Sequence, residues 1–148
     1  ETVVLSSLRG DTGICVDLVK GHHNLGISSE NGYIVPLDCG ATGKTLLAAQ
    51  SDELVERLIQ NYPGLEEKLR NQVKEIRQRG YCISEGEVDE GVAAVAVPLP
   101  MPDHIYTLTY SGPVERLRGL DYMVLVHSLQ QAVKNILLKC DGKRKEAL

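Results

Sequence analysis

The apolar residues follow a strand-like pattern in the first third of the chain. Short β-rich runs alternate with turn-forming residues such as the Arg9–Gly13 segment, and this pattern is typical of antiparallel hairpins. A further turn is indicated at Glu30–Gly32. The predicted strands lie at residues 3–5 and 14–19, and residues 25–28 and 33–37 predict one or two more. We therefore expect the chain to begin with a β-meander.

From Gly43 onward the apolar residues recur with the spacing of a helix. Residues 46–49 form a first apolar helical patch, and Ser51, which two acidic residues follow, predicts the N-cap of a second helix. A third helix is predicted by the spacings of four, four and three among the next apolar residues, with Gly80 as its terminator. Those apolar residues are Leu65, Leu69, Val73 and Ile76.

The last part of the chain predicts three more strands and a long final helix. The strands are expected at residues 81–83, 92–99 and 105–110, and the middle one is apolar on both faces, as suits an interior strand. Seven residues at helical spacing define the apolar side of the final helix: Leu125, Leu129, Ala132, Val133, Ile136, Leu137 and Cys140. The pattern predicts one α+β domain over residues 1–148, with a central antiparallel sheet of about six strands and helices on its faces.

Composition and charge exclude several classes of function. The 148 residues include 16 basic and 20 acidic side chains, for a formal net charge of −4, whereas a surface that coats phosphates is basic. The chain has no Trp and no Phe, which argues against aromatic platforms for single-stranded nucleic acid. The longest apolar run, residues 92–97, is far shorter than a membrane span, and the four widely spaced cysteines favour a reducing, cytoplasmic location.

The Gly40–Thr45 segment is the strongest candidate for a binding element. It resembles a phosphate-binding loop, but Asp38 stands where that motif requires its first glycine, so nucleotide hydrolysis is not supported. Backbone N–H groups that lead from Gly40–Gly43 into a helix favour a small anion, and especially a carboxylate.

The residues provide no established pattern for catalysis or for a metal. The four histidines form no HExxH motif, the acidic run at residues 85–90 lacks calcium-loop spacing and is expected to be a solvated turn, and no serine lies in a GxSxG context. No signature places a general base beside Cys39 or Cys82. We therefore expect no enzymatic activity, no metal and no cofactor, and favour a small-molecule binding module, with a small cysteine-dependent enzyme as an alternative.

Five motifs in series give the chain a specific resemblance. They are residues 43–48 (GKTLLA), residues 76–81 (IRQRGY), Glu87 ahead of Gly91-Val92, residues 95–98 (VAVP), and residues 111–113 (SGP) with Arg116. In this order they resemble the effector-binding domain of the IclR family of bacterial transcription regulators. The resemblance implies a GAF-like fold, assembly as dimers or tetramers, and a winged helix-turn-helix domain ahead of Glu1, through which alone the regulator would contact DNA.

The same resemblance implies where a small metabolite effector would bind. The backbone of two residues at the start of the GKTLLA helix would meet the carboxylate of the effector, and four residues on later strands would complete the lining. These six residues are Ala41, Thr42, Ser84, Ala94, Thr109 and Ser111.

Two of these positions depart from the pattern of the glyoxylate- and pyruvate-sensing relatives. Those relatives carry Asp where Ser84 stands and Cys where Ala94 stands, so this chain has lost a charge and gained space. The change suits a larger or less polar effector, or an oligomerisation domain with a vestigial pocket. The connection at Asn61–Gly64 is also shorter than is usual in the family, and a true deletion and a loop missing from this sequence both remain open.

Overall fold

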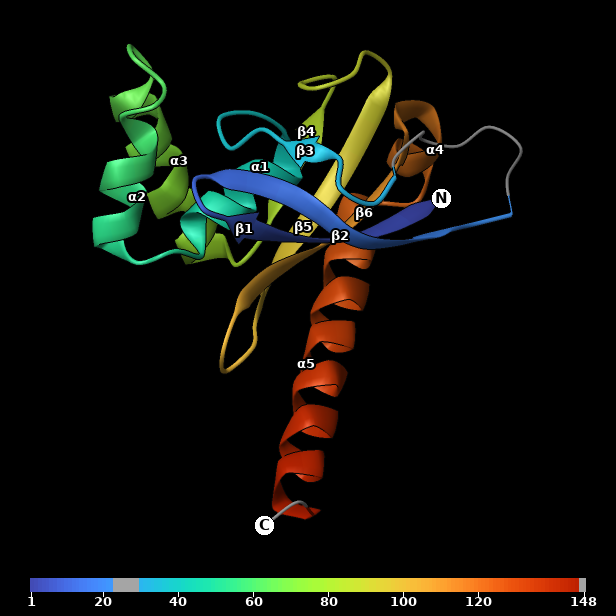
Figure 1. Cartoon of the computed structure of the whole chain (residues 1–148). Coiled ribbons are helices and arrows are strands. Elements are labelled where there is room, and N and C mark those ends of the chain that lie inside the picture. Colours follow the sequence, from blue (N-terminus) through green and yellow to red (C-terminus); the bar gives the residue numbers. More distant parts are fainter. Residues whose placement is uncertain (23–29, 147–148) are drawn as a thin grey trace.

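A six-stranded antiparallel sheet forms the centre of the part of the chain that the structure, a computed structural model, describes: residues 1–22 and 30–146 (Figure 1). The strand order is β3-β2-β1-β6-β5-β4. The strands are β1 (Thr2–Arg9), β2 (Thr12–Lys20), β3 (Ile34–Val35), β4 (Cys82–Glu85), β5 (Val92–Pro100) and β6 (Ile105–Pro113). The α+β class and the antiparallel sheet predicted from the sequence are confirmed.

The first strand lies in the interior of the sheet. β1 and β2 form the predicted hairpin, in which Arg9 pairs with Thr12, and β2 then pairs with β3. On its other side β1 pairs with β6, from Thr2↔Ser111 to Ser7↔Tyr106. The strand predicted at residues 25–28 falls outside the described residues.

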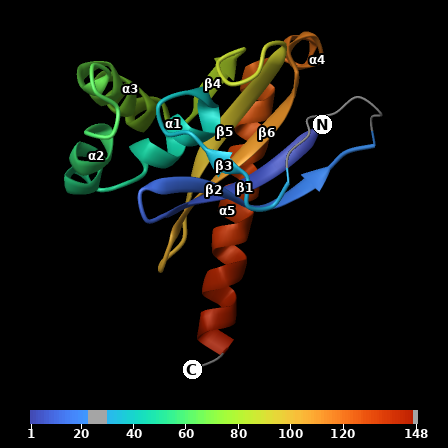
Figure 2. The ribbon, with the colours of Figure 1, turned by 45° about the horizontal axis from the view of Figure 1, so that its top comes forward.

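Helices cover both faces of the sheet (Figure 2). One face carries α1 (Gly40–Ala48), α2 (Asp52–Ile59) and α3 (Glu66–Arg79), and the other carries α4 (Val114–Gly119) and α5 (Tyr122–Glu146). β5 contributes to both apolar cores, because successive side chains of a strand point to opposite faces. Ala96 packs with α1–α3, whereas Val95 and Val97 pack with α4 and α5.

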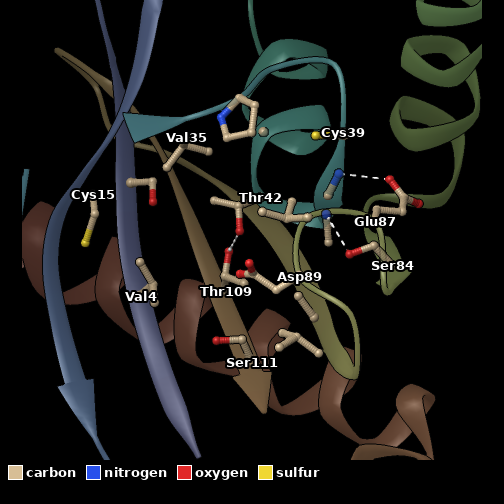
Figure 3. Close-up of a pocket in the computed structure, with 18 of the residues that line it drawn as sticks. Val4, Cys15, Val35, Cys39, Thr42, Ser84, Glu87, Asp89, Thr109 and Ser111 are labelled. Carbon is tan, nitrogen blue, oxygen red and sulfur yellow. Dashed lines mark hydrogen bonds between the residues drawn. The ribbon is translucent and has the colours of Figure 1, made fainter. Parts of the chain in front are cut away.

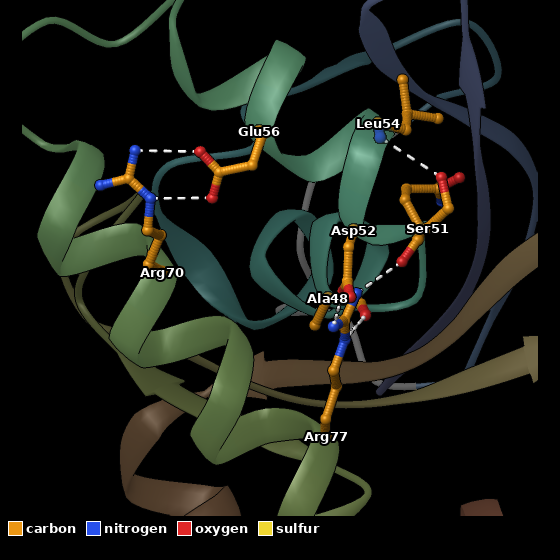
Figure 4. A network of polar contacts seen from close by, with 8 residues as sticks. Ala48, Ser51, Asp52, Leu54, Glu56, Arg70 and Arg77 are labelled. Atoms are coloured by element: carbon orange, nitrogen blue, oxygen red, sulfur yellow. Dashed lines mark hydrogen bonds and ion pairs between the residues drawn. The ribbon is translucent and has the colours of Figure 1, made fainter.

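Caps and arginine contacts hold the first three helices together, and both predicted caps are present. The Ser51 hydroxyl accepts the Leu54 N–H, and Gly80 ends α3 in the left-handed conformation with φ 79°. Arg77 of α3 donates to the carbonyl oxygens of Ala48 and Gln50 at 2.8 and 2.6 Å, which joins α3 to the α1–α2 connection (Figure 4).

Hydrogen bonds of Tyr62 hold the short Asn61–Gly64 connection in place. The Tyr62 N–H donates to the Ile59 carbonyl at 3.0 Å, and the Tyr62 hydroxyl accepts the Leu37 N–H at 3.3 Å. The connection between α2 and α3 therefore also contacts the segment that leads into α1.

The final helix is longer than the surface of the sheet that it covers. Its predicted apolar side is buried at Leu125 and Leu129 but only half-buried at the five later positions, from Ala132 to Cys140. Both views show the C-terminal half of α5 extending away from the sheet (Figures 1 and 2). None of the helices within residues 1–22 and 30–146 combines the length and the apolar character that crossing a membrane requires.

Candidate functional site

A pocket of about 230 Å³ lies between the N-terminus of α1 and the sheet (Figure 3). Its lining comes from β1, β2, β4, β5 and β6, from residues 33–43, and from the β4–β5 turn, which comprises residues 86–91. Segments more than 100 residues apart in sequence therefore meet at one site. A cavity of this size suits a small metabolite.

All six residues that the sequence singled out line this pocket: Ala41, Thr42, Ser84, Ala94, Thr109 and Ser111. The sheet register explains how three of them meet. Ser111 of β6 is the direct partner of Ala94 of β5, and Ala94 is the direct partner of Ser84 of β4, so they form one row across the sheet. Thr109 lies two residues from Ser111 and faces the same side.

Two glycines allow α1 to begin close to the rest of the pocket. Gly40 has φ +72°, and a Cβ there would lie 2.7 Å from the Val88 side chain. At Gly43 a Cβ would lie 1.6 Å from the Pro36 carbonyl oxygen, so α1 could not pack at its present position with any larger residue. The glycines of the GATG segment thus serve close packing of the helix start.

The first N–H groups of α1 donate to side chains of the protein itself. The Gly40 N–H donates to the Glu87 carboxylate at 2.8 Å, and the Ala41 N–H donates to the Ser84 hydroxyl at 2.9 Å (Figure 3). The sequence prediction left the Ala41 N–H for the carboxylate of an effector. In the structure Ser84 from the neighbouring strand accepts that hydrogen bond.

A charged pair fixes the β4–β5 turn to α1. Lys44 Nζ lies 2.8 Å from the Glu87 carboxylate, and the Lys44 side chain is only 8% exposed. Burial alone would raise the pKa of the Glu87 carboxyl, but the hydrogen bonds from Lys44 and from the Gly40 N–H outweigh it and hold that pKa below its ordinary value. Residues 85–90 are all exposed, as expected for a solvated turn, and within this turn the Glu87 carboxylate also completes the start of the helix.

Hydroxyl groups make up much of the polar lining. Thr42 Oγ1 and Thr109 Oγ1 lie 3.0 Å apart, and the Ser111 hydroxyl donates to the Thr2 carbonyl at 3.4 Å. Ser6 Oγ also lines the pocket, is fully buried, and has no hydrogen-bond partner in the described residues. An unpaired buried hydroxyl costs free energy, and the buried hydroxyls of Thr45 and Thr107, outside the pocket, are also unpaired within the part of the chain that the structure describes.

Sequence reasoning missed the part of the lining that comes from the first strand and from the turns. Val4 and Ser6 of β1 line the pocket because β1 pairs with β6, and Val88 and Asp89 reach it from the β4–β5 turn. The alternation of Val4 and Ser6 on one face was readable in the sequence. The pairing of β1 with β6, which brings that face to the pocket, was not.

The cysteines do not have the properties of nucleophiles. Cys39 caps the start of α1 and lines the pocket, and burial, followed by the nearby Asp38 and Glu87 carboxylates, raises the pKa of its thiol. Burial is likewise the main cause of the raised pKa of the Cys82 thiol. Both are therefore protonated at neutral pH. In the described ranges, no three His, Cys, Asp or Glu side chains are grouped closely enough to hold a metal ion.

Comparison with known families agrees with this fold. The model of the family described as "Bacterial transcriptional regulator IclR C-terminal" matches residues 1–138. The chain belongs to the IclR family. It is an effector domain of the IclR type, as the series of motifs predicted.

Individual relatives show the same relationship. The HTH-type transcriptional regulator Rv1719 of Mycobacterium tuberculosis is 36% identical over 128 residues, which is 80% of this chain and 49% of that protein. A crystal structure of an IclR-family regulator from Rhodococcus superposes with a TM-score of 0.82 and 26% identity, covering 93% of this chain and 56% of that one. The inducer-binding domain of PobR from Acinetobacter, a double mutant in complex with 3-hydroxybenzoic acid, superposes with a TM-score of 0.77 and 21% identity, covering 92% and 87%.

The IclR-type domain is similar to only part of each curated relative. It spans between 35% and 57% of the length of the curated regulators that it matches. These relatives are named as transcriptional regulators and not as enzymes.

Proposed function

We propose that this chain is a ligand sensor that binds a small metabolite in the pocket at the start of α1 and so modulates DNA binding by a separate winged helix-turn-helix segment. The observation that carries the proposal is the convergence of all six sequence-selected residues on one 230 Å³ pocket. A regulator of this kind would act in the cytoplasm. DNA would be contacted by the winged helix-turn-helix segment and not by this acidic domain.

A thermal-shift screen of the 148-residue chain tests the binding step. The panel contains small organic acids, sugar acids, polyols and aromatic acids and alcohols. A ligand at 100 times its dissociation constant stabilises the folded state by about 2.7 kcal/mol, or roughly 5–10 °C for a domain of this size. A flat response from a folded sample across the whole panel would contradict the proposal.

Paired hydroxyl deletions test whether the pocket is where the ligand binds. Thr109→Val with Ser111→Ala removes two lining hydroxyls and little volume, and we expect it to weaken any ligand found in the screen by roughly 10- to 30-fold, since each lost hydrogen bond contributes about 1 kcal/mol. Thr107→Val is the matched control. Thr107 lies on the same strand and the same face and is buried, but it does not line the pocket.

The regulatory step is tested with the full-length regulator bound to its operator. An effector shifts a two-state regulator only through its different affinities for the two states, and such coupling typically changes affinity by 5- to 150-fold. We expect operator affinity to change in that range on addition of the ligand. The Thr109 and Ser111 variant should not respond at the same ligand concentration.

We also propose that the chain self-associates as a dimer or tetramer. A groove lined almost entirely by apolar side chains lies between β1, β2, the β5–β6 hairpin and α5. Ile136 of α5 is one of its walls, and Val19 in its lining is 69% exposed. A second copy would cover this surface. Sedimentation should show an oligomer, and Ile136→Glu should dissociate it. Lys134→Glu, at an exposed position of the same helix, is the control and should leave the oligomer intact. A monomeric wild-type chain at 100 μM would contradict this proposal.

A further inference from the structure

We propose, on the basis of the function proposed above, that the effector of this chain is an uncharged molecule with hydroxyl groups and not a carboxylate. The proposal concerns the chemistry of the ligand in the α1 pocket. It rests on three observations: the hydrogen bonds at the start of α1, the charges in the lining, and an unpaired hydroxyl.

The N–H groups of Gly40 and Ala41, two of the donors that would hold a carboxylate, are already used. A helix N-terminus favours an anion because its first N–H groups lack partners within the helix. Here the Glu87 carboxylate accepts the Gly40 N–H, and Ser84 Oγ accepts the Ala41 N–H. The protein therefore supplies its own carboxylate to this helix, and a second carboxylate that bound the Ala41 N–H would have to displace Ser84 and approach Glu87.

The charges that remain in the lining are negative. Glu87 and Asp89 line the pocket, and none of its described lining residues is Lys, Arg or His. Lys44 is engaged with Glu87 and is not part of the lining. Figure 3 shows the Asp89 side chain pointing into the pocket. Lys44 offsets the charge of Glu87, so a carboxylate ligand would meet the charge of Asp89, which forms no ion pair with the described residues, and like charges repel.

The polar groups that remain available are neutral hydroxyls. Ser6 Oγ is fully buried and lacks a partner, Ser84 accepts a hydrogen bond and keeps its own proton to donate, and the Thr42–Thr109 pair uses one of its two protons. Hydroxyls both donate and accept. A ligand hydroxyl can therefore either donate a hydrogen bond to Ser6 or accept one from it. The walls formed by Val4, Val35 and Val88 suit the apolar part of the ligand.

Matched ligands that differ in charge test the proposal directly. Calorimetry on the 148-residue chain would compare 3-hydroxybenzyl alcohol with 3-hydroxybenzoate and 3-hydroxybenzylamine, and erythritol with erythronate. In at least one series we expect the neutral member to bind at least tenfold more tightly than its charged counterparts. Asp89→Asn should narrow the gap between alcohol and carboxylate by threefold or more, while Glu90→Gln, which removes the same charge from the next residue outside the lining, should not.

Ser6→Ala distinguishes a role of Ser6 in ligand binding from a structural role, because the two roles predict different effects on stability and affinity. Removal of an unpaired buried hydroxyl leaves the stability of the free chain unchanged or higher, because no hydrogen bond is lost. The affinity for the neutral ligand should nevertheless fall by about tenfold. Ser7→Ala, on the opposite face of the same strand, is the matched control and should leave that affinity unchanged.

Three results would overturn the inference. They are tighter binding of the carboxylate members, tightest binding of the amine, and no binding of any neutral member up to 10 mM by a folded chain. The first two leave the proposed sensor function intact and change only the class of effector. Failure of the sensor function itself would appear separately, as a flat response of the chain to the complete screening panel.

Discussion

The Lys44–Glu87 pair allows a quantitative test of how firmly the β4–β5 turn is held to α1. Glu87→Gln keeps the shape of the side chain and an oxygen for the Gly40 N–H, but it removes the charge opposite Lys44. The Lys44 side chain is 8% exposed and that of Glu87 is 36% exposed, with 2.8 Å between Nζ and the carboxylate oxygen. The variant therefore leaves a nearly buried ammonium group without its counter-ion.

The expected loss lies between two known limits. Breaking a fully buried pair costs about 3–5 kcal/mol, whereas exposed pairs contribute roughly 0–1 kcal/mol. With one partner buried and the other one-third exposed, we expect Glu87→Gln to lose about 2 kcal/mol of unfolding free energy in urea at pH 7. The melting temperature should fall by roughly 4–8 °C.

Asp11→Asn is the matched control, because the Arg57–Asp11 pair has the same 2.8 Å separation but side chains that are 64% and 49% exposed. It should lose about 0.5 kcal/mol or less. The pKa of Glu87 is lowered in the folded state, so its contribution is present above the ordinary value of 4.5 and is lost as the pH falls through the folded value. Equal losses in the two variants, or a gap between wild type and Glu87→Gln that persists in acid, would refute this reasoning.

Three further predictions follow from single contacts. Gly43→Ala should lower the free energy of unfolding in urea by roughly 3 kcal/mol or more, because the added Cβ would overlap the Pro36 carbonyl oxygen. Gly142 has open space around it, so Gly142→Ala, the control, should leave that free energy unchanged or slightly higher. Tyr122→Phe should raise the pKa of Glu85 from about 2 part of the way toward 4.5 in an NMR titration of the carboxyl carbon, because it removes the hydrogen bond from the tyrosine hydroxyl. The rise should be incomplete, because the hydrogen bond from Arg118, which is the larger cause of the lowered pKa, remains. Cys39→Ser should keep effector affinity within about threefold by calorimetry, because a protonated thiol takes no part in covalent chemistry.

Local patterns were sufficient to predict most of the elements. The cap at Ser51 and the terminator at Gly80 are properties of short segments, and both lie where the sequence placed them. The short helix α4 was not predicted, because its six residues carry one buried apolar side chain, Leu117, and so show no period. The outer apolar positions of α5 were predicted correctly as one side of a helix, but periodicity does not say where the sheet beneath that helix ends.

In the candidate site, too, the sequence predicted what depends on local patterns and missed what depends on tertiary packing. Thr109 and Ser111 were predicted on one face of a strand, and the register confirms that placement. The hydrogen bond from the Ala41 N–H to Ser84, 43 residues away, depends on how α1 sits on the sheet. No local pattern carries that information, so the sequence did not predict that Ser84 accepts the Ala41 N–H.

The interior position of β1 has a consequence for biosynthesis. Its pairing with β6 joins residues that are up to 109 positions apart, so the first strand of this domain to leave the ribosome obtains its second neighbour only when most of the domain has been made. At about 5–20 residues per second, this interval is roughly 5–20 s. During that time the β1–β2 hairpin exposes an unpaired edge, and the pocket, whose wall includes Val4 and Ser6, does not exist. The pocket is thus completed in one late step, when β6 pairs with β1.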